Sequence, residues 1–451
     1  MFKRVLIANR GEIALRIIRA CRAMGIESVA VYSEADADSP HLKEADEAVC
    51  IGGATSAESY LNMTAILQAA EQTEAKAIHP GYGFLSENAL FAELVQQMKF
   101  AWIGPPPHAI RLMGDKATAR RTMGAAGLPV IPGSEGVVAD LDEARALARR
   151  FGYPMLLKAT AGGGGKGMRI CRDEASLADN FAPASLEARL AFGSPGLYLE
   201  KLIEGGRHIE FQFMADAFGQ VVHLGERECS VQRNHQKLVE ESPSPAIDFE
   251  TRARIGAMVC EGMRSIGYVG AGTMEFLRDR DGSLYFMEVN TRLQVEHPGT
   301  EMVTGLDLVQ QQIRVAANEA LAWRQEEVAH HGHAIECRIN AEDPCAGFQP
   351  SPGLVEVFEP PGDVPVAGAR VRLDTHVRPG YRVPLYYDSM ICKLIVHGEN
   401  RPCAIAATLS ALQRFRVEGI KTTIGVHQQI LQHPDFVSGN YDTGLIARML
   451  G

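Results

Sequence analysis

Short apolar runs alternate with amphipathic stretches at the start of the chain, and this alternation limits the possible folds more than any other feature. Residues 4–8 and 28–32 are apolar runs of strand length, and between them the apolar residues of 13–21 fall mostly on one side of a helix. The pattern continues through 77–79 and 100–104. It predicts an α/β fold with a parallel sheet and helices on its faces.

The composition indicates a globular protein of several domains. A length of 451 residues corresponds to about two to four domains of about 100–200 residues each. Hydrophobic residues make up 46% of the chain, which is enough for a buried core. The net charge is -10, from 45 basic and 55 acidic residues. This balance disfavours nucleic acid as the main partner, because duplex binding needs a basic face.

The cysteines and the N-terminus indicate a cytoplasmic protein without a membrane segment. The chain has nine cysteines and no C-x-x-C pair, so we expect buried reduced thiols and no zinc site. The first residues are too charged for the apolar part of a signal peptide. No run approaches the roughly 20 apolar residues that cross a bilayer.

A glycine run at 160–167 predicts a flap that closes over nucleotide phosphates. Its backbone N–H groups can approach an anion closely, and Lys166 adds a positive charge. The run contains G-x-G-x-x-G, but that fingerprint must open a helix, and 168–172 has the pattern of a strand. A Walker A loop is excluded because Thr160 and Gly167 occupy two of its required positions. The alternative is a plain hairpin tip.

Two glutamates face each other in a predicted hairpin over 273–290. Asp281 and Gly282 predict a two-residue type I′ turn, which places Glu275 opposite Glu288; a four-residue loop would make them diagonal neighbours. Two carboxylates about 4 Å apart repel by roughly 4 kcal/mol at an effective dielectric of about 20, so a compensating cation is expected. Hard oxygen ligands suit Mg²⁺ or Mn²⁺. The alternative is a pair of solvent-facing glutamates.

Polar and apolar residues then alternate up to Pro298. If the chain stays extended, one face carries metal ligands, then a fixed cation, then a carboxylate that can act as a base. The pattern predicts an active-site strip. Its side chains are Glu288, Asn290, Arg292, Gln294 and Glu296.

Several segments resemble the ATP-grasp fold, and more specifically biotin carboxylases. They are HPGYGF (79–84), QRNHQK (232–237), EVNTRLQVEH (288–297) and ECRINAED (336–343), with Lys116, Lys158 and the run 200–203. The resemblance extends from Arg4 to about residue 446. It implies a Rossmann-like preATP-grasp domain at 1–115, an ATP-grasp domain at 116–330 with a mobile lid at about 131–203, and an α+β C-terminal biotin carboxylase domain at 331–446.

The resemblance also implies roles for individual residues. ATP would be bound by Lys116, Lys158, Gly164, Gly165, Glu200, Lys201, Leu202, Ile203, His208, Gln232, His235, Glu275 and Glu288. Two Mg²⁺ or Mn²⁺ ions would be held by Glu275, Glu288 and Asn290. Bicarbonate would meet Lys237, Arg292, Gln294, the backbone of Val295, and Glu296, and biotin would meet Tyr82 and Arg338. The catalytic residues would be Lys237, Arg292, Glu296 as the base, and Arg338.

The implied activity is the ATP- and bicarbonate-dependent carboxylation of biotin through carboxyphosphate. It would be the first half-reaction of an acyl-CoA carboxylase, and acetyl-CoA carboxylase of fatty acid synthesis is expected. The alternatives are a pyruvate, propionyl-CoA or other biotin-dependent carboxylase, and an ATP-grasp ligase with a different acceptor. A nucleotide-binding regulatory module without turnover is a further alternative, which an intact base and metal pair disfavour.

The biotin itself is expected on a separate protein. The biotinyl signature Ala-Met-Lys-Met does not occur in the chain, so a biotin carboxyl carrier protein and a carboxyltransferase would act in trans. Biotin would then be a carrier-bound substrate, and the subunit a homodimer. The sequence departs from the family pattern at 242–245 and at Cys392, which concerns packing and not the chemistry.

Overall fold

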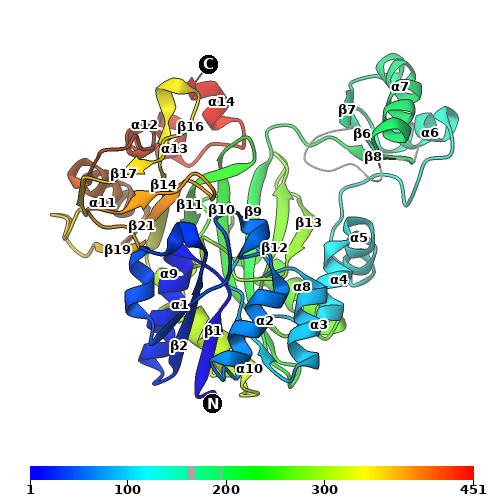
Figure 1. The fold of residues 1–451 in the computed structure, drawn as a ribbon. Helices are drawn as coiled ribbons and strands as arrows, with labels where there is room; N and C mark the ends of the chain where they lie inside the picture. Colours follow the sequence, from blue (N-terminus) through cyan, green and yellow to red (C-terminus); the bar gives the residue numbers. More distant parts are fainter. Residues whose placement is uncertain (160–167, 193–195, 451) are drawn as a thin grey trace. The chain divides into compact units, whose positions relative to one another are not determined.

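The computed structural model describes residues 1–159, 168–192 and 196–450 (Figure 1). The chain forms two compact units, which are described separately below. The first consists of Met1–Ala119, Arg207–Glu275 and Glu288–Gly451. The second consists of Arg120–Gly206 and Phe276–Met287. No helix in the described part of the chain combines the length and the apolar character needed to cross a membrane.

The first unit begins with a parallel sheet of order β3-β2-β1-β4-β5. Along β1, Val5 and Ile7 pack in the same core as α1, while Leu6 packs on the other face with α2 and α3. This confirms the predicted α/β arrangement. The elements are β1 (Arg4–Ile7), α1 (Gly11–Ala23), β2 (Glu27–Tyr32), β3 (Glu47–Cys50), α2 (Met63–Gln72), β4 (Ala77–His79), α3 (Ala89–Gln97), β5 (Ala101–Trp102) and α4 (Pro107–Gly114).

A second, larger sheet has the order β13-β12-β9-β10-β11-β14-β21-β19 (Figure 1). Its long central strands are almost fully buried, so polar side chains on them can form a site that is shielded from water. The strands are β9 (Arg207–Ala215), β10 (Val221–Arg233), β11 (Gln236–Ser242), β12 (Gly270–Arg278), β13 (Leu284–Asn290), β14 (His333–Asn340), β19 (Arg370–Thr375) and β21 (Met390–Gly398).

Helices cover this sheet within the first unit. Helix α9 packs on β10, β11, β14 and β21, and α11 packs on β14 and β21. Two short strands lie in separate ladders, β17 (Gly353–Leu354) and β18 (Val357–Glu359). The remaining helices are α8 (Phe249–Ser265), α9 (His297–Thr304), α10 (Leu308–Ala316), α11 (Arg401–Arg414), α12 (Ile424–Gln432), α13 (Pro434–Ser438) and α14 (Leu445–Leu450).

The second unit is built on a small antiparallel sheet of order β7-β6-β8. Strands β6 (Met155–Ala159), β7 (Met168–Cys171) and β8 (Leu197–Lys201) pack against α6 (Leu141–Phe151) and α7 (Glu174–Phe192). Because β6 and β7 are antiparallel neighbours, the glycine run does connect two strands, as predicted. The run itself, with Gly164 and Gly165, lies outside the described residues.

The turn between β12 and β13 differs from the predicted two-residue turn. The Asp279 N–H donates to the Ser283 carbonyl at 2.8 Å, and the Gly282 N–H donates to the Asp279 carbonyl at 3.1 Å. The loop therefore has three residues, and Gly282, with φ of 93°, takes the left-handed position that such a loop requires. The predicted two-residue turn at Asp281 and Gly282 was therefore wrong.

The polar strip after β13 is also not one extended segment. Strand β13 ends at Asn290, and the chain turns before α9, which begins at His297 with Pro298 in its first turn. Glu296 has φ of -83° and ψ of 14°, which is not an extended conformation. Proline is favoured in the first turn of a helix, and here it marks a helix start where the alternating pattern suggested a strand. Lys116 is the first residue of helix α5 (Lys116–Ala125).

Candidate active site

Lys237 is the centre of a buried charge network in the first unit. Its Nζ donates to Glu296 Oε1 at 2.5 Å, to Glu210 Oε2 at 2.6 Å and to Glu275 Oε1 at 3.3 Å. These residues come from β11, β9, β12 and the turn before α9. Burial alone would lower the pKa of Lys237, but Cys229 and the three carboxylates raise it well above its usual value. Lys237 therefore stays positively charged.

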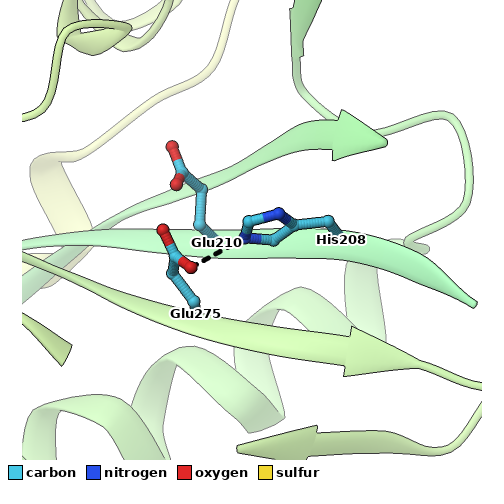
Figure 2. A group of neighbouring side chains, drawn as sticks. All are labelled: His208, Glu210 and Glu275. Atoms are coloured by element: carbon cyan, nitrogen blue, oxygen red, sulfur yellow. Dashed lines mark ion pairs between the residues drawn. The ribbon is translucent and has the colours of Figure 1, made fainter. Parts of the chain in front are cut away.

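Glu275 joins this lysine to two further predicted residues. His208 Nε2 lies 3.0 Å from Glu275 Oε2, an ion pair that Figure 2 shows. Asn290 Nδ2 donates to Glu275 Oε1 at 2.8 Å. Burial opposes ionisation of Glu275, but Lys237 and His208 outweigh it and hold its pKa well below the usual range. The pKa of His208 is raised in turn, because Glu275 overcomes the effect of burial.

The same carboxylate belongs to a group that fits a hard cation. His208, Glu210 and Glu275 each offer one ligand atom, and these atoms lie within 4.8 Å of one another. Figure 2 shows the three side chains. Carboxylate oxygens, with the amide oxygen of Asn290 nearby, are donors that Mg²⁺ accepts. Glu288 does not belong to this group, nor to the second such group among the described residues, Glu210, Cys229 and Glu296. Its Oε2 lies 3.1 Å from Lys116 Nζ.

Arg292 keeps much of the predicted polar strip together despite the turn. Its guanidinium donates to Asn290 Oδ1 at 3.1 Å and to Gln294 Oε1 at 2.9 Å. It also donates to Glu87 Oε2 at 2.8 Å, and Glu87 accepts the Thr291 N–H as well. No sequence pattern indicated Glu87, which lies three residues beyond the HPGYGF segment.

Arg338 bridges Glu296 and Glu240. It donates to Glu296 Oε2 at 2.8 Å and to Glu240 Oε1 at 2.6 Å. Burial would raise the pKa of Glu296, but Lys237, Arg338 and Arg227 hold it well below the usual range. Burial raises the pKa of Glu240 to about 7, although Arg338 opposes this. Glu240 and Glu210 were missed in the sequence, yet Glu210 follows His208 at the spacing of one strand face.

The second unit holds its own set of predicted residues. Lys158 on β6 and Arg120 on α5 both pair with the Glu200 carboxylate on β8. The Lys201 ammonium donates to the carbonyls of Gly152 and Tyr153, at 3.0 and 2.9 Å. Glu200 is buried, while the two residues that follow Lys201, Leu202 and Ile203, are half-buried.

Three predicted residues lie at the edges of the first unit's network. Gln232 and His235 are at the tip of the β10–β11 hairpin, where Gln232 is paired with Lys237 and His235 is exposed. Tyr82 follows β4, is half-buried, and donates its hydroxyl proton to Glu12. Cys392, where the sequence departs from the family pattern, is buried on β21 and packs in the hydrophobic core.

Family models match the chain in consecutive stretches. The model of the biotin carboxylase N-terminal domain matches residues 1–110, and that of the biotin carboxylase C-terminal domain matches 336–448. Between them, the model of the carbamoyl-phosphate synthase L chain ATP binding domain matches 115–324.

Individual relatives are similar over almost the whole chain. The biotin carboxylase of Nostoc sp. is 54% identical over 448 residues, 99% of each chain. Biotin carboxylase 1 of Bacillus subtilis is 54% identical over 444 residues, 98% of each chain. The solved structure of a biotin carboxylase–β-γ-ATP complex from Campylobacter jejuni covers 99% of each chain at 50% identity, with a TM-score of 0.91.

A further solved structure is the biotin carboxylase domain dimer of Hydrogenobacter thermophilus 2-oxoglutarate carboxylase, in complex with MgADP, ADP and bicarbonate. It covers 99% of this chain and 98% of its own, at 48% identity and with a TM-score of 0.90. Identity near one half over full length, with the fold in common, confirms the resemblance predicted from the motifs. The chain belongs to the biotin carboxylase family and is the ATP-dependent ligase that serves as the biotin carboxylase subunit of a biotin-dependent carboxylase.

Proposed function

We propose that this protein carboxylates biotin held on a separate carrier protein, using ATP and bicarbonate, with carboxyphosphate as the intermediate. The observation that carries the proposal is the position of Glu296 between Lys237 and Arg338. One carboxylate is thereby held between a cation proposed for bicarbonate and a cation proposed for biotin. Two relatives support the choice of substrates: the Campylobacter jejuni structure is a complex with β-γ-ATP, and the Hydrogenobacter thermophilus structure is a complex with MgADP, ADP and bicarbonate.

The proposed nucleotide and metal residues keep their predicted roles. Mg²⁺, or Mn²⁺, would be held by Glu275, Glu288 and Asn290, with Glu210 and His208 beside them. When bound, the metal neutralises phosphate charge during phosphoryl transfer. ATP would be bound by Lys116, Lys158, Gly164, Gly165, Glu200, Lys201, Leu202, Ile203, His208, Gln232, His235, Glu275 and Glu288.

In the first step, Glu296 accepts the proton of bicarbonate, and a bicarbonate oxygen attacks the γ-phosphorus of ATP to give carboxyphosphate and ADP. A base works best when its pKa lies near the working pH, yet Lys237 and Arg338 keep the pKa of Glu296 low. We infer that the base becomes stronger when Lys237 turns towards bicarbonate, because this cation then shares its charge with the substrate.

In the second step, carboxyphosphate breaks down to CO₂ and phosphate. Phosphate removes the proton from biotin N1′, and the nitrogen attacks CO₂ to give carboxybiotin. Negative charge develops on the ureido oxygen, where the Arg338 guanidinium stabilises it. Tyr82 lies beside the ureido ring in this proposal.

The setting of the enzyme is also part of the proposal. We place it in the cytoplasm as a homodimer that acts with a carrier protein and a carboxyltransferase in trans; all nine cysteines are free, as reduced thiols would be. Acetyl-CoA is the proposed final acceptor, and the bacterial and chloroplastic biotin carboxylases among the relatives support it. The domain limits at 115, 330 and 446 belong to the same proposal, and the family matches support them.

The decisive experiment measures phosphate release with and without each substrate. We expect ATP cleavage that depends on bicarbonate and is stimulated by free biotin. Equal rates without bicarbonate would show that the bound nucleotide serves another acceptor or is simply hydrolysed. The acceptor is tested separately, by purifying the native complex and supplying acetyl-CoA, propionyl-CoA or pyruvate. Carboxylation of propionyl-CoA or pyruvate in preference to acetyl-CoA would contradict the proposed acceptor.

A further inference from the structure

Lys393 is a charged side chain with no exposed surface, and neither the proposed mechanism nor the sequence motifs give it a role. It lies on β21, directly opposite Arg338 on β14 and Asp374 on β19. Taking an ammonium group fully out of water is costly unless close partners compensate for the lost hydration. The partners of Lys393 therefore indicate why the charge is there.

Its two close partners are a backbone carbonyl and a carboxylate. Nζ donates to the Val295 carbonyl at 2.8 Å and lies 3.2 Å from Glu12 Oε1. Asp374 Oδ2 is farther away, at 4.0 Å, and both oxygens of that carboxylate already accept from Arg372. Glu12 and the Val295 carbonyl are thus the groups that Lys393 holds.

Glu12 extends this contact to Tyr82. Glu12 is buried at the start of α1, and its Oε1 accepts the Tyr82 hydroxyl proton as well as facing Lys393. Its other oxygen has no hydrogen-bond partner among the described residues. The ring centroid of Tyr82 lies 5.7 Å from Lys393 Nζ. The ammonium therefore contacts Val295 directly and Tyr82 through one carboxylate.

The Val295 carbonyl belongs to the peptide group that leads into Glu296. A charged donor on this oxygen fixes the orientation of that peptide, and with it the point from which the Glu296 side chain leaves the backbone. The carbonyl oxygen of the preceding residue, Gln294, lies 2.8 Å from His297 Nδ1, so a second contact restrains the same turn. Turns have few intrinsic restraints, so such contacts decide their geometry.

We propose that Lys393, together with Glu12, is a positioning pair for the carboxylation reaction: it holds the Val295 backbone and the Tyr82 ring in one fixed geometry. This inference rests on the proposed function, in which Val295 meets bicarbonate and Tyr82 meets biotin. Lys393 acts through these groups and does not touch the substrates. None of the described residues proposed for ATP is a close partner of Lys393. The pair should therefore affect the binding of bicarbonate and biotin and leave the binding of ATP unchanged.

The test uses the full-length enzyme with the double substitution Glu12→Gln and Lys393→Met. Removing both charges avoids leaving a single buried ion, which would itself unfold the protein. A lost charge-assisted hydrogen bond at a positioning contact corresponds to about a 10- to 100-fold effect. We expect the KM values for bicarbonate and for free biotin to rise about tenfold or more, while the KM for ATP stays within about twofold.

A matched control is the ion pair of the half-buried Arg252 and the buried Glu226, whose Nε and Oε2 atoms are 2.6 Å apart. The substitutions Arg252→Met and Glu226→Gln remove a comparable pair outside the charge network, and all three KM values should stay unchanged. The inference is overturned if the Lys393 variant raises all three KM values together, or none of them. If the unmodified enzyme lacks bicarbonate-dependent ATP cleavage, the proposed function fails first, and the two failures are distinguishable.

Discussion

At the scale of single residues, Arg338 separates the two half-reactions. It would be needed on the ureido oxygen only after bicarbonate has been phosphorylated, and removing one such stabiliser costs about 10²–10³ in rate. Arg338→Ala should therefore lower carboxybiotin formation by about that factor and leave the slow ATP cleavage without biotin nearly intact. Arg292→Ala should damage both reactions, because bicarbonate itself would be lost. Parallel assays of phosphate and carboxybiotin measure this.

The structure adds a necessary control to this comparison. Arg338 pairs with two buried carboxylates, so the alanine variant leaves Glu240 and Glu296 without a shared cation. Glu240→Gln in the Arg338→Ala background removes one of these charges, and circular dichroism checks the fold. If the reaction without biotin falls as far as the reaction with biotin in both backgrounds, Arg338 supports the fold or the ATP site, and its assignment to biotin is wrong.

Glu241 gives a prediction about stability and pH. Burial would raise its pKa, but His333 and Arg401 lower it to about 2, from an ordinary value of 4.5. A lowered folded-state pKa stabilises the protein above about pH 4.5, and the gain is lost as the pH falls towards 2. The gap in unfolding free energy between the natural protein and Glu241→Gln should therefore shrink by about 1 kcal/mol between pH 7 and pH 3.5.

Urea unfolding at both pH values measures this gap. The exposed Glu261→Gln variant is the control, and its gap should stay constant. A gap for Glu241→Gln that does not change with pH would mean that the carboxyl group has the same pKa in the folded and unfolded protein, and that its contacts with Arg401 and Tyr441 do not favour the ionised form.

The sequence predicted most residues of the charge network but not how they meet. Glu275 and Asn290 were found because a hairpin brings them together locally. Lys237, in contrast, has partners on β9, β12 and the turn before α9, which are separated by 27 to 59 positions along the chain. No short-range pattern reports such contacts. Glu240 and Lys393 were missed for the same reason, since both lie on buried strands whose neighbours are set by the sheet order.

At the scale of elements, the turns of the β12–β13 and β10–β11 hairpins differ from what turn propensities predict. Asp281 and Gly282 have the residues of a two-residue type I′ turn but form part of a three-residue loop. The β10–β11 hairpin has a two-residue turn at Asn234 and His235, with φ of 49° and 65° and no glycine. A left-handed backbone at a residue such as histidine costs about 1–2 kcal/mol. Strain of this kind is common at functional sites.

His235→Gly should therefore stabilise the protein and weaken ATP binding. Relief of the left-handed strain, less the entropy that glycine loses on folding, leaves about 0.5–1 kcal/mol of added stability. The KM for ATP should rise, because the proposed contact with the nucleotide is gone. Chemical unfolding and steady-state kinetics measure the two effects. Asn234→Gly is the matched control in the same turn and should leave the KM unchanged; a stabilised His235→Gly enzyme with normal KM would contradict the role of His235.

Elements were predictable where a periodic pattern continues through the whole element. Strands β1, β2 and β4 and helix α1 follow the apolar patterns predicted for them, and β5 lies within the predicted run 100–104. The segment after β13 was predicted as strand because polar and apolar residues alternate as far as Val295. The helix start at Pro298 and the contacts of Arg292 override that alternation. Where one segment must place several side chains at one site, packing and side-chain contacts therefore decide its backbone conformation, and the local sequence pattern does not predict it.

At the scale of the whole molecule, the residues proposed for ATP occur in both compact units. Lys158 and Glu200 belong to the second unit, and Lys116, His208 and Glu275 to the first. If one nucleotide uses both sets, its binding should stabilise both units, by about 3 kcal/mol at a concentration 100-fold above the dissociation constant. Hydrogen exchange should then slow in β6 and β8 as well as in β9 and β12 when MgATP is added.

A substitution in one unit tests whether a single ligand is responsible. Lys158→Met removes a proposed phosphate contact and leaves Glu200 paired with Arg120, so the second unit should keep its fold. Protection by MgATP should then fall in both units, because the nucleotide that binds less tightly is the same one. Arg169→Gln removes an exposed ion pair with Glu187 in the second unit and is the control, with protection unchanged. The contrary outcome is loss of protection in the second unit alone, with full protection of β9 and β12. It would show that the first unit binds ATP without Lys158. The proposed ATP residues would then have to be divided between two independent sites.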